Sequence, residues 1–107
     1  MFLLVFYVPE SHLEIVKSSL FLAGAGKYQK YDSCCFQTKG VGQFRPLKNA
    51  IPHLGQIGRV ERLEEWKVEL IISKSSIKAV LEALLASHPY EEVAYHVIPI
   101  NTIRDFS

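Results

Sequence analysis

Residues 2–8 read FLLVFYV, an unbroken run of apolar side chains. A strand with one face in water alternates apolar and polar residues, whereas a strand buried on both faces is apolar throughout. The run is too short to span a bilayer, and it has neither the basic leader nor the cleavage site of a signal peptide. We therefore expect a central strand over residues 2–8, in a cytoplasmic protein with no membrane partner.

Two segments have the spacing of amphipathic helices. The first begins with a capping box, Ser11–Glu14, and stops at the glycines of residues 24–26. The second follows a serine cap at Ser73 or Ser75 and stops at His88–Pro89. The apolar positions that predict the helices are Leu13, Val16, Leu20 and Ala23 in the first, and Ile77, Val80, Leu81 and Leu84 in the second.

Three further strands are expected from composition and alternation. They cover residues 28–39, residues 59–73 and about residues 91–100. Glycines and prolines mark residues 40–58 as a long connection that has room for a hairpin but not for a helix of any length. The order strand, helix, strand, strand, helix, strand predicts the α+β class and a ferredoxin-like βαββαβ fold, an antiparallel four-stranded sheet with two helices on one face.

The length of the chain limits the number of domains, and its charge limits the class of partner. We expect residues 1–107 to form a single domain, which is the usual size for one core. Lys and Arg total 12 against 11 for Asp and Glu, so the charge argues against a nucleic-acid partner.

Both faces of residues 2–8 are apolar, yet the helices cover one face only. We therefore expect copies of the chain to cover the other face in a homo-oligomer.

The segment HPYEEVAYHV, residues 88–97, contains two histidines and two carboxylates where the second helix ends. One interpretation is structural: Pro89 ends the helix, and Tyr90 packs over the corner. The other is a binding site. Glu91 begins an otherwise apolar strand face, and a carboxylate there needs solvent or a partner because burying it alone is costly. His88 and Arg45 are the two candidate partners.

A divalent metal is a neighbouring hypothesis for the same corner. His88 and Glu91 offer nitrogen and oxygen ligands, and a threefold axis would bring three copies of one histidine together. Glu92 and His96 would stand about 13 Å apart along a strand, too far to chelate one ion. The alternative function is thus a divalent-metal-binding protein or a metal-dependent enzyme that uses His88 and Glu91 as an acid–base pair.

The segment GVGQFR, residues 40–45, is the second candidate site. Its glycines allow backbone N–H groups to turn toward an anion, and Arg45 can clamp a phosphate or carboxylate. The expected ligand is a small anionic metabolite or a nucleotide. A lone G-x-G is equally typical of a bulged hairpin. The candidate ligand-binding residues are Gly40, Gly42, Gln43, Phe44 and Arg45 here, with His88, Tyr90, Glu91 and Glu92 at the corner.

Several motifs in order resemble the insert domain of the Nif-three-like (YqfO) proteins, also named GTP cyclohydrolase type two homologs. They are GAGKY at 24–28, CCF at 34–36, GVGQFRP at 40–46, AIP at 50–52 with Gly55, and HPYEEVAYHVIPI at 88–100. The corner His88–Glu91 is also similar to that of CutA proteins, whose fold resembles that of PII signalling proteins.

This resemblance implies a stand-alone insert domain with a CutA/PII-like fold and a tendency to form trimers. The larger proteins build a two-metal site in lobes that flank the insert. We expect no such lobes here, so none of those metal ligands carries over and no catalytic residue is assigned. The predicted function is a non-catalytic regulatory or small-ligand-binding oligomeric module.

Overall fold

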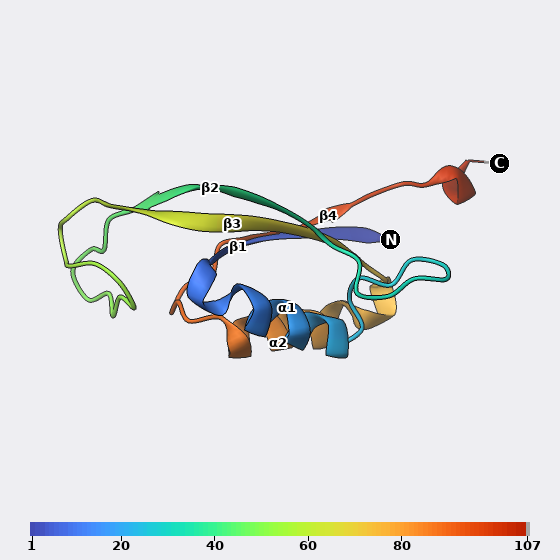
Figure 1. Cartoon of the computed structure of the whole chain (residues 1–107), viewed down its shortest axis with the longest axis horizontal. Helices are drawn as coiled ribbons and strands as arrows, with labels where there is room; N and C mark the ends of the chain where they lie inside the picture. The colour runs from blue at the N-terminus through green and yellow to red at the C-terminus, as the bar shows by residue number, and fades with distance from the viewer. Residues whose placement is uncertain (107) are drawn as a thin grey trace.

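The computed structural model describes residues 1–106, and within them four strands form one antiparallel sheet that packs against two helices (Figure 1). The elements are β1 (Phe2–Pro9), α1 (Leu13–Leu22), β2 (Phe36–Phe44), β3 (Glu61–Ile72), α2 (Ile77–Ser87) and β4 (Tyr95–Pro99). The strand order is β2-β3-β1-β4, and every neighbouring pair is antiparallel. This is the predicted ferredoxin-like βαββαβ fold, with α1 and α2 on one face.

Strand β1 is central, as its apolar run predicts. It pairs with β3 along its whole length and with β4 over residues Phe2 to Phe6. Its side chains Leu4, Phe6 and Val8 are fully buried on the helix side, and Val5, on the opposite face, is only 4% exposed. Burying each such side chain stabilises the folded state by about 1.5–3 kcal/mol, so β1 contributes strongly to the packing of the sheet against the helices.

The core lies between the sheet and the two helices. The helices contribute their predicted apolar stripes, and β3 contributes alternate residues. The buried side chains from these elements are Leu13, Val16, Leu20, Val68, Leu70, Ile72, Val80 and Leu84.

The predicted serine caps at the two helix starts are wrong. Each helix is entered through a single 3₁₀ turn, Glu10–His12 or Lys74–Ser76, and no side-chain cap bond forms at either start within residues 1–106. The Ser11 hydroxyl instead lies 2.9 Å from His12 Nδ1, because the extra turn places the serine beside that ring.

The predicted glycine stop of the first helix is confirmed. The Ala25 N–H donates to the Leu20 carbonyl at 2.9 Å, and the Gly24 N–H donates to the Phe21 carbonyl at 3.1 Å. These are the two bonds of a Schellman motif, which needs a left-handed residue in the position of Gly24, where φ is +109°.

The bounds of β2 and β4 differ from those predicted. Residues 28–31 form a tight turn in which Tyr28 and Tyr31 bond to each other, so β2 starts only at Phe36. It then continues through Gly40 to Phe44, which leaves residues 45–60 as the connection to β3. Strand β4 is shorter than predicted, because residues 91–94 still form the corner.

The sheet face opposite the helices mixes apolar and charged residues. Phe36 is 69% exposed and Ile98 is 43% exposed at its two edges, while Lys67 and Glu69 form an ion pair between them. In the part of the chain that the structure describes, no helix has both the length and the apolar character needed to cross a membrane.

Candidate functional site

A cleft of about 730 Å³ opens beyond the end of β1. The β2–β3 pair runs past Pro9, the last residue of β1, and the connection 45–60 folds back toward the corner after α2 (Figure 1). This volume is within the range of small-molecule sites, about 300–1,000 Å³. The cleft is thus bounded by the two segments that the sequence marks as candidate sites.

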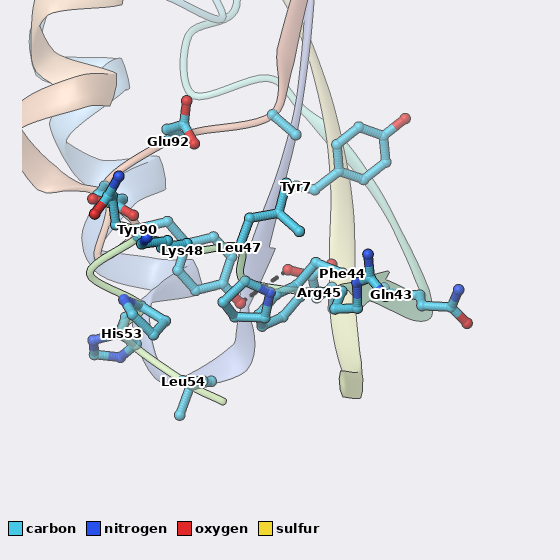
Figure 2. A pocket seen from close by; sticks show the side chains of 18 of the residues that line it. Tyr7, Gln43, Phe44, Arg45, Leu47, Lys48, His53, Leu54, Tyr90 and Glu92 are labelled. Atoms are coloured by element: carbon cyan, nitrogen blue, oxygen red, sulfur yellow. Dashed lines mark hydrogen bonds between the residues drawn. The ribbon is translucent and has the colours of Figure 1, made fainter. Parts of the chain in front are cut away.

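Most of the predicted ligand-binding residues surround this cleft (Figure 2). Gly40 lies instead beside a smaller depression of about 220 Å³ along β2. His88 is 6% exposed and is not part of the lining. The predicted residues that line the cleft are Gly42, Gln43, Phe44, Arg45, Tyr90, Glu91 and Glu92. The long connection 40–58 was predicted as a whole to line the site, and Leu47, Lys48, Asn49 and His53 of this connection do so without having been assigned individually. Sequence reasoning missed the lining residues Tyr7 and Glu65.

The partner of Glu91 is a backbone group of the long connection. The Ile51 N–H donates to Glu91 Oε1 at 2.8 Å, and neither His88 nor Arg45 pairs with this carboxylate within residues 1–106. The two suggested side-chain partners are therefore wrong, and the alternative that the carboxylate reaches solvent is confirmed. Because residues 91–94 are not in β4, Glu91 lies at the solvated corner, where the connection 45–60 can reach it.

His88 is held by two hydrogen bonds. Its Nε2 lies 2.7 Å from the Tyr7 carbonyl oxygen, and its Nδ1 lies 3.2 Å from the Tyr90 N–H. A neutral imidazole with its proton on Nε2 satisfies both bonds. Burial lowers the pKa of His88; the bond to Tyr7 opposes this shift, and the nearby His12 and His53 lower the pKa further.

These bonds bear on the predicted metal ligands. Both nitrogens of His88 are engaged, so coordination by His88 and Glu91 would require the ring to give up one of its bonds. Within residues 1–106, no three His, Cys, Asp or Glu side chains gather as a metal site. Coordination by His88 and Glu91 stays a prediction.

Tyr90 forms one wall of the cleft. Its hydroxyl donates to Glu65 Oε2 at 3.0 Å. Burial raises the pKa of Tyr90, and the charge and hydrogen bond of Glu65 raise it further, so the phenol keeps its proton. Its ring lies 4.9 Å from the His88 ring and 6.3 Å from the Phe44 ring, centroid to centroid. This wall of the cleft is therefore aromatic, and the Tyr90 hydroxyl directs its proton toward Glu65.

Two cationic side chains of the lining are available to a ligand. Arg45 and Lys48 form no ion pair with any residue in 1–106. Glu65 and Glu91 already accept the bonds described above. Arg45 was predicted from its place in GVGQFR, whereas Lys48 has no sequence signal beyond its charge in a glycine- and proline-rich connection.

No protein-family model matches the chain, but curated proteins do. The chain is 43% identical over 97 residues to the GTP cyclohydrolase 1 type 2 homolog of Bacillus subtilis, a match covering 91% of this chain and 26% of that protein. Its counterpart in Mycobacterium leprae is 41% identical over 96 residues, which cover 90% and 25%. The chain thus spans about a quarter of the length of these relatives.

Solved structures agree with both parts of the resemblance. A Bacillus cereus protein related to NIF3 superposes with a TM-score of 0.82 at 39% identity, covering 94% of this chain and 26% of that one. The periplasmic divalent cation tolerance protein CutA of Archaeoglobus fulgidus gives 0.68 at 16% identity, over 95% and 86%. The PII-like CutA of Nostoc gives 0.69 at 15%, over 99% and 89%. The chain is therefore homologous to one segment, about a quarter of the length, of the GTP cyclohydrolase 1 type 2 homologs of the NIF3 family, and it has the fold of CutA.

Proposed function

We propose that this chain is a small-ligand-binding regulatory module without catalysis of its own, and that the cleft is its ligand site. The observation that carries the proposal is the bond from the Ile51 N–H to Glu91. It joins the corner after α2 to the connection 45–60, which follows GVGQFR directly, and residues of both candidate segments line one cleft of suitable size.

The lining favours a small anion with an apolar or planar part, such as a nucleotide or an anionic metabolite. Arg45 and Lys48 supply positive charge, and an arginine can bind a phosphate or carboxylate with two parallel bonds. Phe44 and Tyr90 supply aromatic surface on the same cleft. Glu92 also lines the cleft and disfavours a ligand whose negative charge lies near the corner.

The hydrogen bonds of His88 and Tyr90 support binding rather than acid–base turnover by these two groups. The His88 nitrogens are both hydrogen-bonded, and the Tyr90 phenol keeps its proton. General acid–base catalysis needs a group that exchanges protons with the substrate near neutral pH. The activity of the full-length relatives comes to this chain only as a hypothesis, because the match covers about a quarter of their length.

We further propose that the module is a cytoplasmic homo-oligomer, and specifically a trimer, in which copies cover the open sheet face. Support comes from Phe36 and Ile98, which expose apolar surface at the edges of that face. The adjacent cysteines Cys34 and Cys35 are free, which suits a reducing compartment. Native mass measurement tests the assembly. Phe36→Lys should lower the mass, whereas Leu22→Lys should not, because Leu22 is 90% exposed at the end of α1, away from the sheet face.

Calorimetric titration tests ligand binding, with inorganic phosphate, pyrophosphate, nucleotides and small dicarboxylates as the probes. At least one should bind, and Arg45→Ala and Lys48→Ala should each weaken binding about tenfold or more, because each removes a charge-assisted bond. Lys30→Ala is the matched control, since Lys30 lies in the turn after α1 and not in the cleft. Heat signals from none of the probes, or equal losses in all three variants, would contradict the proposal.

A further inference from the structure

Two histidines to which no ligand contact has been assigned lie close together: His53 lines the cleft, and His12 lies beside it. His12 ends the 3₁₀ turn that leads into α1, and His53 belongs to the connection 45–60. Their ring centroids are 5.8 Å apart, and the rings are inclined by 87°. His12 is half-buried and His53 is exposed, so a solute ion can reach the pair.

Each of these rings has a nitrogen free for another partner. The Nδ1 of His12 lies 2.9 Å from the Ser11 hydroxyl, which leaves Nε2 without a hydrogen bond among the described residues. No hydrogen bond from a His53 ring nitrogen forms within residues 1–106 either. Neutral imidazole with an unengaged nitrogen is a preferred ligand of zinc, copper and nickel.

The separation of the two ring centroids is compatible with one metal ion that both imidazoles ligate. A metal–nitrogen bond of about 2.1 Å, with about 1.1 Å more to the ring centre, places an ion about 3.2 Å from each centroid. Two rings on one ion then stand about 5.2 Å apart at a tetrahedral angle and about 6.4 Å apart in line. The observed 5.8 Å lies between these limits.

We propose that His12 and His53 form a two-histidine site for a transition-metal ion, with water completing its coordination. The bound ion would fasten the connection 45–60 to the start of α1. His53 also lies 6.1 Å from the Tyr90 ring, so the ion would hold the connection against that wall of the cleft. Metal binding itself does not depend on the proposed function; only its effect on the cleft rests on it.

The ligand set also predicts which ions bind. Imidazole sites follow the order Ni²⁺ < Cu²⁺ > Zn²⁺, so Cu²⁺ binds most tightly, whereas Mg²⁺ and Ca²⁺ require oxygen ligands and do not compete. A site with two protein ligands is weaker than a structural site with four. This site is separate from the predicted pair His88 and Glu91.

Titration with Zn²⁺ or Ni²⁺ alone tests the site. The background variant Cys34→Ser with Cys35→Ser removes the two free thiols as competing ligands. In that background, His12→Ala and His53→Ala should each weaken binding at least tenfold, because one ligand is lost, while His96→Ala, on the exposed part of β4, should leave it unchanged. Circular dichroism confirms that each variant folds. Equal binding by all three variants, or loss in only one of the first two, overturns the proposal.

Limited trypsin digestion tests the fastening, because Lys48 lies in the connection and Lys30 lies in the distant turn after α1. Zn²⁺ at ten times its dissociation constant should slow cleavage after Lys48 about tenfold and leave cleavage after Lys30 unchanged. The His53→Ala variant should lose this protection. Protection that is absent, or equal at both lysines, overturns the proposal. Neither experiment contains an anionic ligand, so their outcome is independent of the calorimetric test of the cleft.

Discussion

The Nε2 atom of His88 lies 2.7 Å from the main-chain carbonyl oxygen of Tyr7. This bond joins the end of α2 to the central strand β1, and the other nitrogen of the same ring holds the Tyr90 N–H. One buried side chain therefore fixes the direction in which the corner leaves the helix. The residues that follow it, Tyr90, Glu91 and Glu92, are thereby placed along the cleft.

The buried His88 predicts a loss of stability in acid. Burial lowers its folded-state pKa below the ordinary value of 6.5, so between these two values the unfolded chain binds the extra proton. The stabilisation is fully present above pH 6.5 and is lost as the pH falls toward the folded pKa. Urea unfolding in chelator-containing buffer from pH 7.5 to pH 5 should show this decline. His88→Gln should flatten it, whereas His96→Gln, an exposed histidine, should not. Equal slopes in wild type and His88→Gln would contradict this role.

The hydroxyl of Tyr90 predicts a specific coupling with Glu65. Tyr90→Phe removes the 3.0 Å bond to the Glu65 carboxylate, and we expect a loss of about 1–2 kcal/mol of unfolding free energy. Tyr95→Phe is the control, because the Tyr95 hydroxyl forms no hydrogen bond within residues 1–106. A double-mutant cycle with Glu65→Ala, which removes the acceptor, should give a coupling energy that accounts for most of the loss. Additive effects would show that the bond contributes little.

Replacing the two glycines of β2 by alanine is expected to change the stability of the fold in opposite directions. A Cβ at Gly42 would overlap the Glu65 carboxylate, whereas a Cβ at Gly40 meets open space. Gly40→Ala should therefore stabilise the fold by about 0.5 kcal/mol, because it restricts the unfolded chain. Gly42→Ala should instead displace Glu65 and break its bond to Tyr90, with a net loss of about 1 kcal/mol. Thermal unfolding of the two variants decides, and a stabilising Gly42→Ala would refute the close contact.

The apolar pattern allowed the sheet and helices to be predicted, because burial requires periodic side chains. The run of residues 2–8 and the alternation around Val68 each place a buried strand correctly. The second strand was predicted too early, because the aromatic residues of 28–31 favour strands yet form a turn, with Gln29 at φ +53°. The strand also passes through Gly40, which lowers strand propensity but is tolerated in β2 at the edge of the sheet.

The candidate site was only partly predictable for a different reason. Composition marked the GVGQFR and HPYEE segments, and the structure brings both to one cleft. The connection 45–60, which follows GVGQFR, is linked to the HPYEE corner by the backbone N–H of Ile51. Every residue except proline carries this group, so no side-chain pattern could identify Ile51 as the partner of Glu91. The closeness of His12 and His53 likewise depends on the path of a connection without periodic structure.

The final prediction concerns the Ile51 amide, which donates the hydrogen bond to Glu91. Its hydrogen bond to the exposed Glu91 carboxylate contributes about 1 kcal/mol, so Glu91→Ala should speed exchange of this amide proton about fivefold. Glu91→Gln keeps an acceptor oxygen and should retain much of the protection. Glu92→Ala is the matched control, because no hydrogen bond to the Glu92 side chain forms within residues 1–106. Hydrogen exchange followed by NMR measures all three variants. An Ile51 amide equally protected in Glu91→Ala and Glu92→Ala would show that other contacts hold the connection 45–60 in place, and the cleft would then owe its shape to them.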